Sequence, residues 1–188
     1  MKFVIISISI LCFSHEICSQ KISERRERLR KELSQYIVID SQGFGPYDLE
    51  TSPIWRKADT LLGALPLANA IDYFHDSSHT LKYYSFLRIL LLNDDTAFKL
   101  LASVITDSTL VFCRFDDYWN HEKFNHLLAF EYKMFIDAKY SSGGKWSGNG
   151  SHYFGSGIYY FPKSNEKLWN KKYAKFLRLV TPYGLNPK

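Results

Sequence analysis

Residues 80–107 contain the densest run of hydrophobic side chains, and their spacing predicts two helices joined by a short polar turn. In the first half, Lys82, Ser85 and Arg88 recur at three-residue spacing in an otherwise apolar sequence. Such a narrow polar stripe is typical of a helix that is buried on most sides. In the second half, apolar residues follow helical spacing along one face only. The turn at residues 93–95 is so short that we expect the two helices to be antiparallel neighbours.

The rest of the chain also follows a mainly helical pattern. The expected elements are helices at residues 21–39, 54–62, 66–74 and 165–180 and a strand at residues 109–115. Residues 124–140 fit either a strand or a helix, because apolar residues alternate there and also share one helical stripe. Residues 141–157 include six glycines and are predicted to form a loop. The predicted fold is mainly α, made of antiparallel helix pairs with a minor β element; an α+β fold is the alternative.

The first 19 residues have the pattern of a secretory signal peptide. Lys2 precedes an apolar run at residues 3–13, which is too short to span a bilayer as a helix, and a small Ser19 favours cleavage before Gln20. An uncleaved N-terminal anchor is the alternative. We therefore expect an exported protein, periplasmic or extracellular, with no transmembrane segment in the mature chain. Residues 20–45 would form a charged helix and linker, and residues 46–188 a single mainly helical domain with the Gly-rich loop.

Composition and charge narrow the class of protein. The 188 residues are 46% hydrophobic and 23% charged, which is typical of a globular protein. The net charge of +5 is concentrated at the two ends, because residues 20–33 contribute +3, residues 34–162 contribute −4 and residues 163–188 contribute +6. Basic ends favour anionic partners, but nucleic acid is not expected as the partner of an exported protein.

Cysteine usage predicts no disulfide within the mature chain. Cys12 and Cys18 lie in the predicted signal peptide, so Cys113 is the single cysteine that remains after cleavage. It lies in the predicted strand at residues 109–115, where we expect a small buried hydrophobic side chain rather than a nucleophile, because no sequence motif links it to a base.

Several of these segments together resemble a group of uncharacterised exported proteins of the Bacteroidetes. The resemblance covers about residues 60–180 and rests on the helix pair, the step from Asp107 to Cys113, residues 124–135 and residues 172–180. The central region is similar to a HEAT-type unit of paired helices. The resemblance implies a helix rather than a strand at residues 125–139, and it carries no catalytic motif.

One cluster of polar residues suggests metal-dependent chemistry. His121, Glu122 and His126 approximate a zinc-protease helix, but the two histidines are five residues apart where that motif has four, which would turn them to different sides of a regular helix. Asp116 and Asp117 precede them and could complete a site in an irregular turn. The candidate catalytic residues are these five; a solvated loop is the alternative. We expect no bound metal and no cofactor.

Candidate binding residues lie in two other places. Trp146 and Tyr153 are aromatic residues of the Gly-rich loop, where they could contact a ligand or fold back onto the core. Lys171, Lys175 and Arg178 form a basic side of the last predicted helix, which could face an anionic surface or simply solvent.

These patterns predict a non-enzymatic interaction or structural module of the cell envelope. Its partner would be another envelope protein or an anionic envelope surface, reached through the exposed side of the helix array and the loop at residues 143–157. The alternative is a small metal-dependent hydrolase that uses the cluster at residues 116–126.

Overall fold

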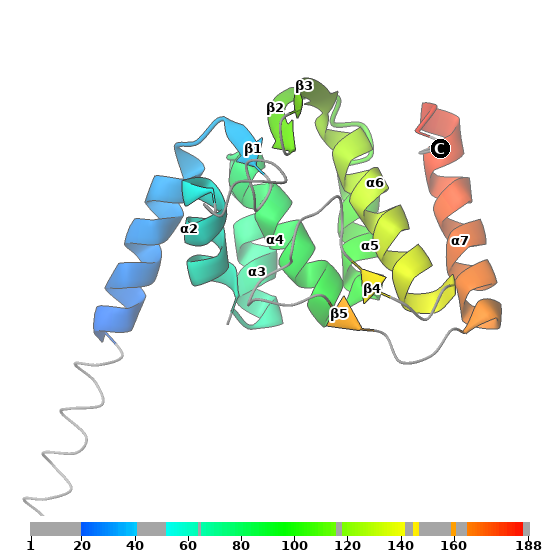
Figure 1. Ribbon diagram of the computed structural model, residues 1–188, viewed down its shortest axis with the longest axis horizontal. Coiled ribbons are helices and arrows are strands. Elements are labelled where there is room, and N and C mark those ends of the chain that lie inside the picture. The colour runs from blue at the N-terminus through cyan, green and yellow to red at the C-terminus, as the bar shows by residue number, and fades with distance from the viewer. Residues whose placement is uncertain are drawn as a thin grey trace, which may run out of the picture.

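A computed structural model of the chain describes residues 20–40, 52–63, 65–115, 118–141, 145–146, 159–160 and 165–185. These residues form a mainly helical array with a small sheet at one end, as the mainly α prediction requires (Figure 1). The helices are residues 20–34, α2 (Pro53–Leu62), α3 (Leu67–Phe74), α4 (His79–Leu92), α5 (Asp94–Ser103), α6 (Phe124–Ile136) and α7 (Glu166–Val180). Two shorter helical pieces are the π-helix Asp137–Ser141 and the 3-10 helix Thr181–Tyr183. The strands are β1 (Val38–Asp40), β2 (Leu110–Phe115), β3 (Tyr118–Lys123), β4 (Lys145–Trp146) and β5 (Tyr159–Tyr160).

The predicted helix pair is confirmed as α4 and α5. Asn93 alone separates the two helices, and its side chain accepts a hydrogen bond from the backbone N–H of Thr96 at 3.0 Å. The ring of His79, at the start of α4, lies 3.1 Å from a carboxylate oxygen of Asp107, beyond the end of α5. The two helices are therefore antiparallel. The second helix ends at Ser103, four residues earlier than the hydrophobic pattern predicted.

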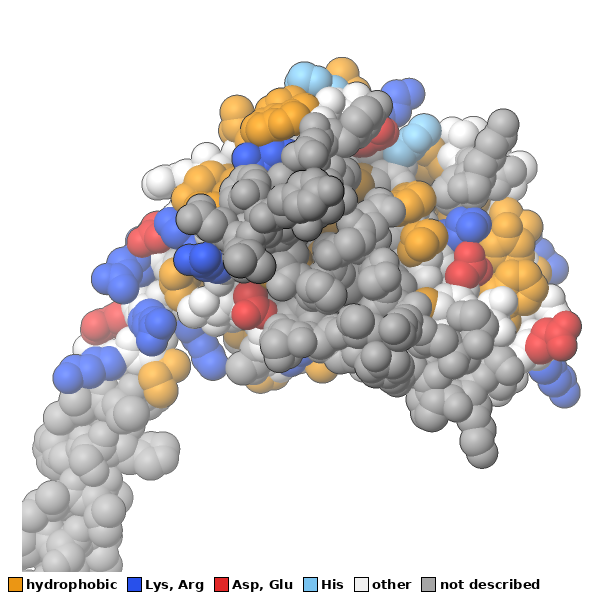
Figure 2. Space-filling view, in the orientation of Figure 1, with side chains coloured by type: hydrophobic (Ala, Val, Ile, Leu, Met, Phe, Trp, Pro, Cys, Tyr) orange, Lys and Arg blue, Asp and Glu red, His pale blue; other side chains and the backbone are white. Residues whose placement is uncertain are grey.

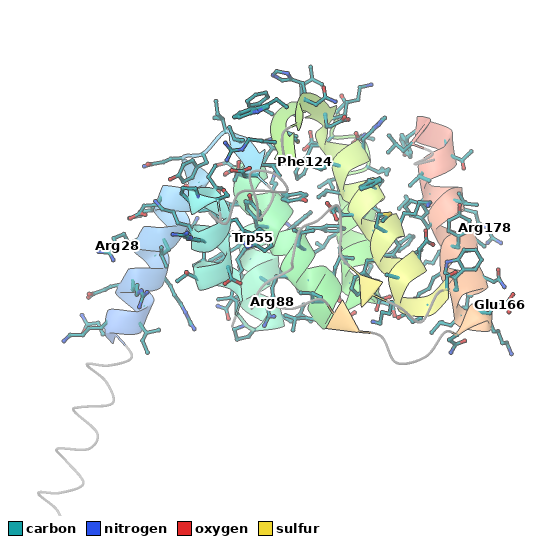
Figure 3. All side chains as sticks on the ribbon, viewed as in Figure 1. Arg28, Trp55, Arg88, Phe124, Glu166 and Arg178 are labelled. Carbon is teal, nitrogen blue, oxygen red and sulfur yellow. The ribbon has the colours of Figure 1, made fainter. Side chains whose placement is uncertain are left out.

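Helix α4 lies at the centre of the array. Nine of its fourteen residues are buried, and it contacts α2, α3, α5, α6 and β1. On one side, Trp55 of α2 (Figure 3) packs edge to face against Tyr84, with 6.0 Å between the two ring centroids. The narrow polar stripe predicted a helix that is buried on most sides, and this is confirmed. Within the stripe, Lys82 and Arg88 are partly exposed, Ser85 is fully buried, and Arg88 donates a hydrogen bond to the carbonyl oxygen of Leu65.

The two outer strands of the three-stranded sheet, β1 and β3, differ from the elements that the sequence predicted. A helix was expected over residues 21–39, but it ends at residue 34 and the chain continues into β1, which pairs in parallel with β2. β3, which was not predicted, pairs antiparallel with β2, so the order is β1-β2-β3. The β-branched residues Ile37, Val38 and Ile39 favour an extended backbone once a partner strand is present.

Residues 124–140 are helical, as the resemblance implied. α6 packs against α4, α5 and α7, so its apolar residues are buried along a helical stripe and the alternating pattern has no structural role. The chain then continues into the π-helix. Of the predicted Gly-rich loop, Lys145 and Trp146 form β4, which pairs antiparallel with β5, and Ser141 ends the π-helix. Within the ranges given above, no helix combines the length and apolar character needed to cross a membrane.

A partly buried ion cluster, centred on Asp94 and Lys172, joins α5, the π-helix and α7. The Lys172 ammonium group lies 2.7 Å from one oxygen of Asp94 and 2.8 Å from an oxygen of Asp95, and Lys139 lies 3.1 Å from the other oxygen of Asp94. Tyr140 also donates a hydrogen bond to Asp94. Burial alone would raise the pKa of Asp94, but the two lysines outweigh burial and lower it. The cluster fixes α7 against the start of α5.

Replacing Lys172 with Met should test this cluster, because methionine keeps the aliphatic stem and removes the charge. We expect the free energy of unfolding to fall by about 2 kcal/mol, somewhat less than the usual cost of an unpaired buried charge, because Lys139 still pairs with Asp94. Urea denaturation measures the change. Lys171→Met is the matched control, since Lys171 is exposed on the same helix.

The pH dependence of the same two variants has a defined sign. Because the pKa of Asp94 is lowered, its contribution to stability is present above the ordinary aspartate value of about 4 and is lost as the pH falls through the lowered pKa. K172M should therefore lose less stability than K171M on acidification. Equal stability of K172M and K171M at neutral pH would show that Lys172 contributes nothing to the stability of the fold.

Cys113 occupies the inner side of β2 and is fully buried. Burial raises the pKa of its thiol to about 12. At mildly alkaline pH, only about one thiol in ten thousand is then ionised, and the thiolate is the reactive form.

We therefore expect Cys113 to be inert in the folded protein. A chromogenic disulfide reagent should label less than a tenth of the chains that begin at Gln20 within an hour, and one thiol per chain in concentrated guanidinium chloride. Rapid labelling without denaturant would contradict the buried position of the thiol.

Candidate functional site

The predicted catalytic cluster is not assembled by the described residues. His121 and Glu122 are consecutive in β3, so their side chains leave opposite faces of the sheet. His126 lies in the first turn of α6. Asp116 and Asp117 lie outside the described residues. Across the ranges that the structure describes, no group of three or more His, Cys, Asp or Glu side chains could hold a metal ion.

The predicted binding residues do not come together in one site among the described residues. Lys171, Lys175 and Arg178 are exposed on α7, and Arg178 points away from the helix array (Figure 3). The apolar side of α7 packs on the core, where Phe176 and Val180 are fully buried, so that side is not free to enter a bilayer. Tyr153 lies outside the described residues. Trp146 lies in the two-residue strand β4.

The structure instead presents an exposed aromatic surface on the sheet. We define the outer face as the outward-pointing side chains of the three strands, apart from Asp40, which is buried. They are Val38, Leu110, Phe112, Arg114, Trp119, His121 and Lys123. Leu110 is 63% exposed and Trp119 is 53% exposed, and Ile37, just before β1, is 81% exposed. In Figure 2, hydrophobic side chains and a histidine gather at this end of the molecule. Such a concentration of exposed large apolar groups marks an interaction surface.

The rings of the outer face form a continuous row across β2 and β3. The ring centroids of Phe112 and Trp119 lie 5.2 Å apart, and those of Phe112 and His121 lie 4.9 Å apart. The backbone explains this closeness: the N–H of Phe124 donates to the carbonyl of Thr109, which makes those two residues a hydrogen-bonded pair. Pairs alternate along an antiparallel ladder, so Phe112 and His121 form a non-hydrogen-bonded pair, in which side chains approach most closely.

A buried carboxylate fixes one end of this row. Asp40 is 1% exposed and binds the guanidinium group of Arg114 through two hydrogen bonds, from Nε to Oδ1 at 2.8 Å and from Nη2 to Oδ2. The hydroxyl of Ser52 donates to the same carboxylate at 2.6 Å. The centre of the guanidinium group lies 4.9 Å from the ring centroid of Trp119. The exposed indole is therefore held against a guanidinium group that cannot rotate freely.

The backbone of β1 is fixed from the other side by α4. The hydroxyl of Tyr84 donates to the carbonyl of Asp40 at 2.7 Å and accepts from its backbone N–H at 2.9 Å. Burial raises the pKa of Tyr84, so the hydroxyl stays protonated and can keep both roles. The outer face is thus anchored to the centre of the helix array.

Sequence reasoning did not select Asp40, Phe112, Arg114 or Trp119. The signal that was present is weaker: strand-forming Val111, Phe112, Phe115, Tyr118 and Trp119 lie on both sides of Asp116 and Asp117, a residue type that favours turns. The pairing of Asp40 with Arg114 had no such signal, since the two residues are 74 positions apart.

A comparison of the chain with protein families, curated proteins and solved structures finds no match. The resemblance to exported proteins of the Bacteroidetes therefore stays a prediction.

The ion pair between Asp40 and Arg114 can be tested by removing the negative charge of Asp40. Asp40→Asn leaves the guanidinium group of Arg114 without its carboxylate, and we expect the free energy of unfolding to fall by about 3 kcal/mol. The exposed Asp72→Asn is the control and should change it by less than about 0.5 kcal/mol. Urea denaturation gives both values.

A double-mutant cycle adds a sharper criterion. If the two side chains act as a pair, D40N combined with Arg114→Met should cost clearly less than the sum of the two single changes. Additive effects would contradict the anchoring role of Asp40.

Proposed function

We propose that this protein is an exported, non-enzymatic interaction module of the cell envelope, and that it makes its contacts through the outer face. The observation that carries the proposal is the concentration of exposed large hydrophobic groups at the sheet. Of the six found among the described residues, Leu110 and Trp119 lie on it, and Ile37 directly precedes β1. Leaving them in water is unfavourable in the free protein, so a partner that covers them gains free energy on binding.

The composition of the outer face fits binding better than catalysis. Trp and Arg are enriched among the residues that carry most of the binding energy at protein interfaces, and Phe is enriched in the composition of those interfaces. The guanidinium group of Arg114 is held by Asp40, so it needs little further ordering when a partner arrives. No paired acid and base, and no nucleophile beside a base, is formed by the outward side chains. The hydrolase alternative has no observation in its favour among the described residues.

The proposal predicts that binding to the envelope depends on Trp119. Purified protein should sediment with envelopes isolated from the cells that make it, and Trp119→Ser should weaken that binding by at least about tenfold, because it removes the largest exposed ring. A sedimentation titration measures the affinity. Tyr183→Ser is the matched control, since Tyr183 is 48% exposed and lies beyond α7, away from the sheet.

The outcome is decided by comparing the two variants. Thermal unfolding should show that both variants are folded, with a modest loss of stability in W119S because it loses the contacts of Trp119 with Phe112 and Arg114. If W119S and Y183S bind the envelope as well as the unmodified protein does, the outer face is not the contact surface and the proposal fails.

A further inference from the structure

We propose that the ligand of the outer face is an acidic polysaccharide chain, a step that rests on the proposed function. The outer face offers a row of rings with the exposed Lys123 at one end and, at the other end, Arg114, whose charge is paired with Asp40. A polymer of sugar rings that carry carboxylate groups has matching features, namely C–H groups on its ring faces and negative charge at its edges.

The size of the outer face favours a thin polymer over a folded protein. The face consists of seven side chains, whereas a stable protein interface uses roughly 20 to 30 residues from each partner. A single extended chain a few sugar units long needs no larger surface. A linear chain can lie along the row from Trp119 through Phe112 to His121.

The chemistry of the rings suits sugar faces. The face of an aromatic ring is negative, and the C–H groups of a pyranose carry a small positive charge, so the two attract each other in addition to burying apolar area. Trp119 is 53% exposed, which leaves much of the indole free for such stacking. Arg114 supports the indole and is itself held by Asp40, so the platform is formed before the ligand binds.

The charges on the outer face favour an anionic ligand. Its cationic side chains are Arg114 and Lys123, at opposite ends of the paired strands, and His121 lies between them. The single carboxylate on this side of the described sheet, Asp40, is buried and already paired with Arg114. A ligand carboxylate therefore meets little repulsion from the strands and can pair with Lys123, which is exposed.

The edge of the sheet is less suited to a protein partner than its face. β3 pairs only with β2 in the described sheet, and an open strand edge can add a strand from another chain. Here the edge carries the charge of Lys123, and the backbone N–H of His121 already donates to the side-chain oxygen of Asn120 at 2.8 Å. Both features discourage strand addition. Binding at the outer face is therefore favoured over strand addition at the β3 edge.

Affinity electrophoresis in native gels tests the inference with two probes: polygalacturonate, an unbranched polymer of uronic acids, and dextran, a neutral polymer. Polygalacturonate should retard the unmodified protein and Tyr183→Ala equally, and dextran should retard neither. Trp119→Ala should weaken binding at least tenfold, and Lys123→Ser about threefold. Trp119→Phe should restore most of the binding, because a ring remains. Added salt should weaken binding, because one part of it is ionic.

Three results would overturn the inference: no retardation by polygalacturonate, equal retardation by dextran, or full binding by W119A. Failure of the inference can be told apart from failure of the proposed function. If polygalacturonate does not bind while sedimentation with the envelope still depends on Trp119, the ligand is a protein or another envelope component and the proposed function stands. If neither binding depends on Trp119, both fail.

Discussion

The burial of α4 is the constraint on which the other elements depend. A helix with nine buried residues out of fourteen must be surrounded, and α2, α3, α5, α6 and β1 each cover part of it. Its apolar side chains supply much of the core, including Phe86, Leu87 and Leu90, all fully buried. The neighbouring elements together therefore have to exclude water from this one helix.

Polar pairs then select one arrangement among those that would bury α4 equally well. Tyr83 of α4 donates a hydrogen bond to Glu131 of α6 at 2.7 Å inside the core, and Asp94 pairs with Lys172 between α5 and α7. Buried pairs of this kind contribute little net stability compared with well-packed apolar residues, but a structure that separates the partners is penalised strongly. We infer that they fix how α6 and α7 sit along their neighbours.

The same logic extends to the outer face. The Asp40 carboxylate lies in the interior and Trp119 lies in solvent, and Arg114 connects them. Moving an unsupported aromatic ring on the surface would require little free energy. A ring supported by a guanidinium group that is held by a buried carboxylate has fewer positions, which reduces the entropy lost when a ligand binds. The core is therefore linked directly to the surface that we propose as the binding site.

The sequence by itself determined the local elements. Ser52, Ser78 and Asn93 each accept a hydrogen bond from a backbone N–H in the first turn of the following helix, so the starts of α2, α4 and α5 follow from short-range chemistry. The apolar density of residues 80–107 likewise predicted the central helix pair. Signals of this kind act over a few residues, so they can be recognised in the sequence without knowledge of the rest of the fold.

Only the tertiary structure decided the long-range contacts. β1 has three residues and becomes a strand because β2, more than 70 positions later, pairs with it. Residues 124–136 carry both a strand pattern and a helical pattern, and packing against α4, α5 and α7 selected the helix. The outer face likewise exists only once β1, β2 and β3 lie side by side. Pairing between distant segments depends on which surfaces the whole chain buries, and no local pattern encodes that choice.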